Sequence, residues 1–272
     1  MNSAPIDIND VNVDAIELRK SKLDRKMGKM YNIFHQGKRL EVILPEMDAT
    51  FGAKILTDFG KITLPLSFNG MDQETSRGLR LRRAHTKLIE IQQKIRDIIM
   101  KSPADFFKDK KKPEIYNERI KDFIVPSVSK EGKVYADVFR LEIQKAISND
   151  PNKSPEELEI ARKEFVSMKD APLLKDKAKN ALVVNQDNVE QVIPWGTRIK
   201  PVVSFAYLWI MGSDQKCTPK WFLIHGLITS DQKKTQIDLN PDEPDDDEEM
   251  EAPSAPPPTQ ELLQEDDEDM EE

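Results

Sequence analysis

Cysteine is almost absent from this chain of 272 residues, and histidine is scarce. Cys217 stands alone, which excludes a disulfide framework and a zinc site built from cysteines. The three histidines, His35, His85 and His225, show no paired-ligand spacing, so no metal site is expected. No apolar run is long enough to cross a bilayer as a helix, and the first residues lack the pattern of a secretory signal. These absences predict an intracellular protein of a reducing compartment, without a membrane partner.

The sequence also lacks the short motifs of common enzyme classes. It contains no phosphate-binding GxxxxGK[ST] loop, no GxGxxG after a strand and no GxSxG. The few glycines lie at expected turns, and the acidic residues of the first 237 positions do not cluster as in two-metal nucleases. We therefore expect no enzyme activity, no catalytic residue and no cofactor.

Positively charged side chains are missing from the end of the chain. Residues 238–272 hold 17 acidic residues and no lysine or arginine, so 32 acidic and 41 basic residues remain in 1–237, a net charge of +9. With three consecutive prolines and almost no apolar residues, this tail cannot bury enough surface to fold alone. Its two densest acidic blocks consist of Asp245, Asp246, Asp247, Glu248, Glu249, Glu265, Asp266, Asp267, Glu268 and Asp269.

Two interpretations of this charge division are open. A basic body joined to an acidic tail is typical of a protein that binds a polyanion and carries an internal competitor for the same surface. The alternative is a tail that only keeps the protein soluble. The sequence predicts three parts: a basic N-terminal arm at 1–29, a β-barrel domain at 30–237 and a disordered regulatory tail at 238–272. For the arm, contact with phosphates and a solvated strand edge are equally open.

Hydrophobic periodicity predicts strands that come as hairpins. Alternation of apolar and polar residues around turn residues predicts hairpins at 29–45, 51–68 and 122–143, and longer strands at 192–211 and 221–229. Apolar residues at helical spacing predict one helix from Asp72 or Thr75 to Lys101. A Ser-Pro-Glu-Glu capping box predicts a second one at 154–168. Antiparallel hairpins with two helices favour a β-rich (α+β) fold, a small antiparallel barrel with helical insertions.

Aromatic residues alternate along two of these strands next to lysine and arginine. Unpaired nucleobases stack on aromatic rings, and phosphates require nearby cations, so this combination is typical of single-stranded nucleic-acid binding. The alternative is that strand aromatics belong to the core, and Trp221 and Phe222, on opposite faces of one strand, place at least one ring there. The candidate nucleic-acid-binding residues are Lys38, Arg39, Lys133, Tyr135, Phe139, Arg140, Arg198, Lys200, Tyr207 and Trp209.

The helix at 72–101 carries a row of cations beside its apolar stripe. A ridge that contacts phosphates and an ordinary solvated helix face are both compatible with this row, and the second is the commoner case. The row consists of Arg80, Arg83, Lys87, Lys94 and Lys101.

The hairpin around 123–135, the strands at 202–211 and 221–228 and the acidic tail together resemble the OB-fold single-stranded-DNA-binding proteins of large DNA viruses and phages. The resemblance covers residues 115–272, and the first hundred residues only loosely. It implies a five-stranded barrel that coats single strands in replication, recombination and repair. It also implies a tail that occupies the DNA groove and recruits replication enzymes once displaced. Many such tails end in an aromatic residue, whereas this one ends Asp269-Met270-Glu271-Glu272.

The sequence therefore predicts a non-enzymatic, sequence-tolerant single-stranded-DNA-binding protein regulated by its tail. If viral, it would act in the host nucleus or at a viral replication site, and self-association is left open. The main alternative is an interaction module resembling a histone chaperone, in which the tail binds basic protein partners. A factor for duplex DNA or RNA is a third class.

Overall fold

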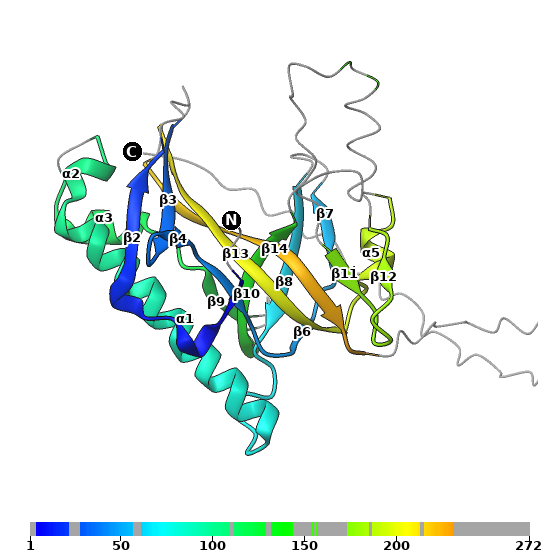
Figure 1. The fold of residues 1–272 in the computed structure, drawn as a ribbon. Coiled ribbons are helices and arrows are strands. Elements are labelled where there is room, and N and C mark those ends of the chain that lie inside the picture. Colours follow the sequence, from blue (N-terminus) through cyan, green and yellow to red (C-terminus); the bar gives the residue numbers. More distant parts are fainter. Residues whose placement is uncertain are drawn as a thin grey trace, which may run out of the picture. The chain divides into compact units, whose positions relative to one another are not determined.

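A computed structural model describes most of the chain (Figure 1). The described residues are 4–21, 28–56, 61–108, 111–128, 132–143, 154, 156, 173–184, 187–212 and 215–230. All of them belong to one compact unit, Met1–Gln232. The predicted tail lies outside the described residues, as does the predicted helix at 154–168 except for Ser154 and Glu156.

Five strands close into a barrel: β6 (Met47–Ala49), β8 (Lys61–Ser67), β10 (Val134–Ile143), β14 (Cys217–Ile228) and β13 (Thr197–Met211). They pair in that order, and β13 pairs again with β6. Four of the five pairings are antiparallel, whereas β10 and β14 run parallel where Glu142 lies opposite Phe222. The predicted OB-fold-like barrel is confirmed, with this one parallel seam as a departure from a fully antiparallel arrangement.

The longest barrel strand, β13, also organises the sheet outside the barrel. It pairs along its length with β3 (Gly28–His35), β5 (Glu41–Ile43) and β6 on one side and with β14 on the other. Its pairing register shifts between Val202 and Val203 and between Phe205 and Tyr207. Such bulges bend a strand and increase its twist, which lets β13 curve from the barrel into the extended sheet.

The first described residues are part of this sheet. β1 (Ile6–Asp7) pairs with β5, and β2 (Ile16–Lys20) pairs with β3. Ile8, Val11 and Ile16 are buried in the core. Residues 4–21 therefore pack at the edge of the sheet, as in the strand-edge alternative that the sequence left open for this part of the chain.

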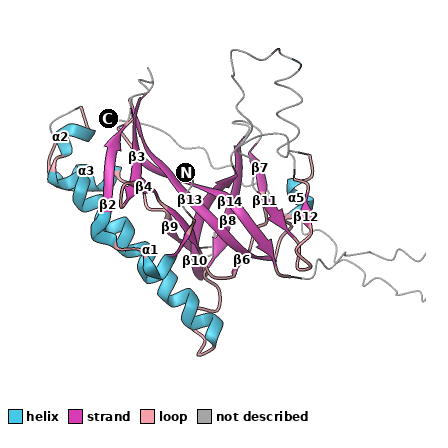
Figure 2. Cartoon of the chain, viewed as in Figure 1, coloured by secondary structure: helices cyan, strands magenta, loops and turns pink. Residues whose placement is uncertain are grey.

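Helix α1 (Ser76–Lys101) covers the core from one side. Thr75 caps it, since the backbone N–H of Gly78 donates to the Thr75 hydroxyl at 3.0 Å. Its buried face, Leu81, Ala84, Leu88, Ile91, Ile95 and Ile99, has the predicted helical spacing. Figure 2 shows α1 beside the strands together with the short helices α2 (Pro103–Phe106) and α3 (Pro113–Arg119), whereas α5 (Val189–Val192) lies apart from them.

The remaining strands extend the barrel at its edges. β4 pairs with β3, β7 with β8, β9 with β10, and β11 with both β12 and β14. Their bounds are β4 (Lys38–Arg39), β7 (Lys54–Leu56), β9 (Ile124–Val128), β11 (Leu173–Lys175) and β12 (Ala181–Leu182). The hairpins predicted at 29–45, 51–68 and 122–143 are thus present, with β6 as an additional strand between the first two.

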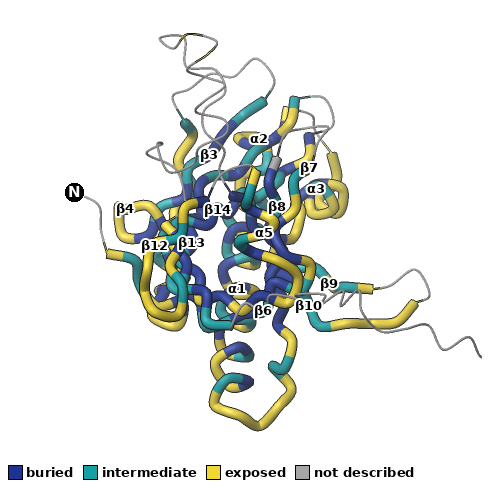
Figure 3. The backbone as a smooth tube through the Cα atoms, turned by 90° about the vertical axis from the view of Figure 1, so that its right-hand side faces the viewer, coloured by how far each residue is buried: buried dark blue, intermediate teal, exposed yellow. Residues whose placement is uncertain are grey.

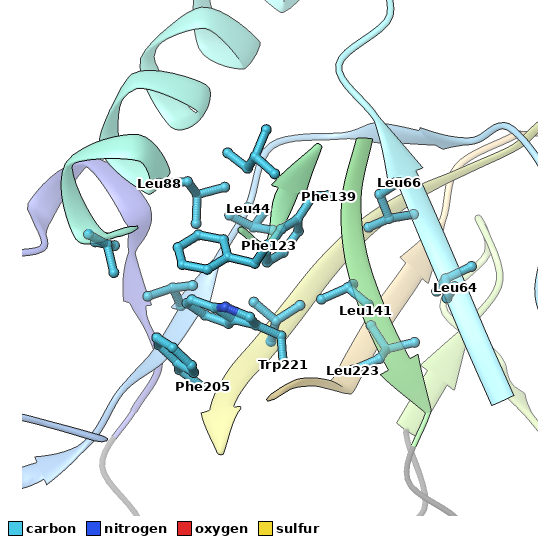
Figure 4. Packing of buried hydrophobic residues seen from close by; sticks show 14 of the residues in the cluster. Leu44, Leu64, Leu66, Leu88, Phe123, Phe139, Leu141, Phe205, Trp221 and Leu223 are labelled. Carbon is cyan, nitrogen blue, oxygen red and sulfur yellow. The ribbon is translucent and has the colours of Figure 1, made fainter. Parts of the chain in front are cut away.

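The barrel core is centred on stacked aromatic rings (Figure 4). The Trp221 ring lies parallel to the Phe205 ring at 4.2 Å, and the rings of Phe139 and Phe123 meet it at 5.3 and 5.5 Å. Trp221 is therefore the core member of the Trp221–Phe222 pair. Cys217 is buried beside this core, and burial raises the pKa of its thiol to about 12, so it stays protonated at neutral pH.

Candidate nucleic-acid interface

The outer side of β13 brings aromatic rings and cations onto one solvent-facing surface. Beyond the second bulge, Leu208 and Ile210 point into the core, whereas Tyr207 and Trp209 point outward and are half-buried. Side chains of residues directly opposite each other on paired strands lie on the same side of a sheet. The neighbours of Tyr207 on β3 and β14, Asn32 and Lys220, therefore share this side with it.

Phe222 continues the row of rings on β14. It is half-buried, and its ring meets the Tyr207 ring edge-on at 6.0 Å. The Trp209 indole packs closely against the backbone at Gly28. A Cβ at Gly28 would lie 2.9 Å from Cζ2 of the indole and 2.3 Å from the Ile210 carbonyl oxygen. Three rings thus lie on adjacent strands with one side toward solvent.

A fourth ring with two arginines adjoins this row on β3. Phe34 is on the same side of β3 as Asn32, two residues along the strand. The Arg19 guanidinium lies over the Phe34 ring, 4.6 Å from its centroid, and Arg39 pairs directly opposite Phe34. We call this surface the aromatic face. It consists of Phe34, Tyr207, Trp209, Phe222, Arg19, Arg39 and Lys220.

The cations of the aromatic face differ in how tightly they are already held. Arg39 is exposed and has no ion-pair partner among the described residues. Arg19 pairs with Glu17 at 2.7 Å, but both side chains are about half exposed, and such exposed pairs are worth little. Lys220 donates to Glu142 at 2.6 Å across the parallel seam, in a partly buried setting. Phosphate contact is therefore easiest at Arg39 and Arg19.

Two further predicted cations lie at the opposite end of β13. Arg198 and Lys200 are exposed on its outer side, before the first bulge. The Nε of Arg198 lies 3.3 Å from Asp48, whose carboxylate also accepts from Arg77 at 2.9 Å. Asp48 is thus held by two arginines. Lys200 is exposed and unpaired within the described ranges. These two cations share the strand of Tyr207 and Trp209 but not their end of it.

The predictions on the β9–β10 hairpin divide into two groups. Tyr135 is 49% exposed, with the Lys133 ammonium 5.4 Å from its ring centroid, and Arg140 is exposed. Figure 3 shows this hairpin extending away from the body of the fold. Phe139 is fully buried against Trp221, so the prediction that it stacks on bases is wrong. The register shift between Tyr135 and Val138 turns the two aromatic residues to opposite sides.

The β4 residues lie on opposite sides of their strand. Arg39 belongs to the aromatic face, whereas Lys38 pairs opposite His35, whose side chain is buried. Three residues of the aromatic face were missed from the sequence, namely Phe34, Lys220 and Phe222, and Arg19 was covered only by the phosphate-contact alternative for residues 1–29. The sequence did contain a signal for Phe222. Both sides of the strand at 221–229 are apolar, so Phe222 remains on the outer side when Trp221 lies in the core.

Two of the five cations in the row on α1 are paired with carboxylates. Lys87 pairs with Glu90 at 2.6 Å, and Lys94 donates to Asp14 at 2.8 Å. The hydrogen bond from Lys94 lowers the pKa of Asp14 below its ordinary value. These pairs favour the interpretation of this row as a solvated helix face. A hollow of about 390 Å³ beside it is lined by Asn9, Leu79, Arg82, Arg83, Thr86, Lys87 and Glu90.

Positive charge also gathers at the start of β3. Lys29 donates to the carbonyl oxygens of Asp105 and Phe106 at 3.0 and 3.1 Å. Burial, followed by repulsion from Lys20 and Lys108, lowers the pKa of Lys29.

The described residues contain no group of histidine, cysteine and carboxylate side chains suited to a metal ion. None of the described helices has the length and apolar character needed to span a membrane.

Comparisons with known proteins give matches among solved structures only. No family model matches the sequence, and a search of curated proteins finds no match. The single-stranded DNA-binding protein from bacteriophage Enc34 is 13% identical and has a TM-score of 0.38, covering 82% of this chain and 96% of its own. The C-terminal truncation of that protein is 12% identical to this chain with a TM-score of 0.39, and its complex with ssDNA is 13% identical with a TM-score of 0.38. Each of these two covers 80% of this chain and 97% of its own.

Proposed function

We propose that this protein binds single-stranded DNA with little sequence preference and acts in DNA replication, recombination and repair. The observation that carries the proposal is the aromatic face, four half-buried rings on adjacent strands with Arg19, Arg39 and Lys220 among them. Every unpaired base has a flat face that stacks on an aromatic ring, at about 1–3 kcal/mol per base. Duplex DNA keeps these faces covered, so the geometry favours single strands.

Phosphate contacts supply the second part of the proposed affinity. Arg19, Arg39, Lys220, Arg198 and Lys200 all lie on the outer side of the sheet that contains β13. For single strands the logarithm of the binding constant falls with the logarithm of salt concentration by about 0.7 per neutralised phosphate. Five such contacts give a slope of about −3.5.

The test is a fluorescence-anisotropy titration of the full chain with a labelled single-stranded oligonucleotide at several salt concentrations. We expect binding to single-stranded DNA with a salt slope near −3.5, competed poorly by the matching duplex. Equal competition by duplex or by RNA of the same sequence would assign the chain to a broader nucleic-acid-binding class. Absence of binding, together with binding of basic proteins, would instead support the interaction module resembling a histone chaperone.

We further propose that the acidic tail competes in cis for the same surface and contacts replication proteins when displaced. The supporting observation is the opposite charge of the two parts, +9 for residues 1–237 and −17 for the tail. A tethered polyanion has an effective concentration in about the millimolar range, so it discourages weak ligands while long single strands displace it.

Deleting residues 238–272 should therefore tighten single-stranded DNA binding by about fivefold or more at low salt, a usual size for coupling between sites. The gain should shrink as salt rises, because screening weakens the competitor. The same anisotropy titration measures both effects. A full-length control with the aspartates and glutamates of the tail replaced by asparagine and glutamine should behave like the deletion. Unchanged or weaker binding in both variants would contradict competition by the tail.

A further inference from the structure

An exposed tryptophan lies just before β13, away from the aromatic face. Trp195 is 78% exposed, more than any other large hydrophobic residue described. Its indole has no ring, cation or hydrogen-bond contact to any of the described residues. Tryptophan is a large, mostly apolar side chain that is usually highly buried, so an indole left in water points to a ligand that covers it.

The turn that presents Trp195 is held firmly. The Gly196 N–H donates to the Ala49 carbonyl at 3.0 Å, and the Ala53 N–H donates to the Ile193 carbonyl at 2.8 Å. The Thr197 hydroxyl closes the turn by donating to the Pro194 carbonyl at 2.8 Å. The indole therefore projects from a fixed backbone, in contrast to a side chain on a loose loop.

A second exposed ring lies on the neighbouring loop. Phe51 is 46% exposed and precedes Gly52, which has a φ of +64°. A Cβ at Gly52 would lie 2.8 Å from the backbone nitrogen of Trp195, so the two loops touch at this glycine. The chain thus places two exposed aromatic residues on adjoining, tightly packed loops at one end of β13.

Cations connect this end of β13 to the aromatic face. Arg198 is only three residues from Trp195, no more than about 11 Å along the chain. Arg198 and Lys200 both point outward on β13, which continues to Tyr207 and Trp209. An exposed indole thus lies just before this strand, and the outer side of the strand carries first two cations and then further rings.

We propose that Trp195, assisted by Phe51, is a second base-stacking site, which binds an unpaired nucleobase of a strand whose phosphates contact Arg198 and Lys200. This inference rests on the proposed function and extends it, because it assigns a second point of contact at the far end of β13. A flat, unsaturated ring joined to a phosphate matches an exposed indole followed by two cations.

The test combines affinity with tryptophan emission from a variant in which Trp195 is the one exposed indole among the described residues. Trp195→Ala should weaken binding of an oligonucleotide of about 16 nucleotides by about 5- to 150-fold, whereas Trp195→Phe, which keeps a ring, should lose much less. In a Trp209→Phe background the remaining indoles are Trp195 and the buried Trp221. Single-stranded DNA should quench the emission of this variant, and a strand of equal charge without bases should not.

The outcomes separate the inference from the proposed function. If the wild-type chain binds single-stranded DNA but Trp195→Ala binds within twofold of it, the second site is wrong and the aromatic face stands. The second site is also wrong if Trp195→Ala weakens binding of the base-free strand as much as binding of single-stranded DNA, since stacking would then play no part. If the wild-type chain binds no single-stranded DNA, both proposals fail together.

Discussion

Replacing Tyr207 and Trp209 together with alanine should weaken single-stranded DNA binding by at least about 30-fold. Two stacked bases at about 1 kcal/mol or more each account for this loss. Both rings point outward from the middle of the sheet, and Tyr207 also contacts Phe222, so their removal opens the centre of the aromatic face. The measurement is a titration of the double variant and the wild type at the same salt concentration.

Two control variants and a stability measurement accompany this experiment. Tyr207→Phe with Trp209→Phe preserves two aromatic surfaces and should retain most of the affinity. Tyr135→Ala removes a more exposed ring on the projecting hairpin and measures whether that hairpin contributes. The unfolding temperature of each variant shows whether a loss reflects binding alone. A double alanine variant that stays folded and binds within twofold of the wild type would remove the aromatic face from the mechanism.

The second large effect is on stability. Trp221→Ala should lower the free energy of unfolding by about 3–5 kcal/mol, the usual cost of removing a large aromatic side chain from a packed core. The indole stacks on Phe205 and meets Phe139 and Phe123 edge-on or tilted, so its loss leaves a cavity bordered by three rings. Urea denaturation followed by circular dichroism gives this value directly.

Trp221→Phe is the matched variant for this prediction. The Trp221 Nε1 is buried without a hydrogen-bond partner among the described residues, and an unpaired buried donor costs about 1–3 kcal/mol. Phenylalanine keeps a ring against Phe205 and removes that donor, so the two effects of this substitution oppose each other. We expect it to be clearly less destabilising than alanine, and equal losses in the two variants would contradict this account of the core.

The regular elements were predictable from the sequence because their patterns are long. The 26 residues of α1 repeat an apolar stripe over seven turns, and Thr75 supplies a cap, so the helix was placed almost to the residue. The hairpin strands show the same regularity at a period of two. By contrast, β1, β6 and β11 have two or three residues each, and their pairing depends on partners far away in the chain.

The candidate site was predicted less well because bulges change which side a residue occupies. Regular alternation along β13 would place Phe205 on the same side as Tyr207 and Trp209, but the register shift after Phe205 turns Phe205 inward and leaves the other two outside. The same irregularity in β10 separates Tyr135 from Phe139. Alternation gives the faces of a strand only up to the first bulge, and nothing in these segments marks the bulge with a glycine.

The contact between Gly28 and Trp209 has a consequence for affinity. An indole that lies against backbone on one side has few orientations open to it before any strand arrives. Less conformational entropy is then lost when a base covers the other side, which is the advantage of pre-organisation. In the proposed complex, part of the binding free energy is in this way set during folding, by a residue that has no side chain to offer the ligand.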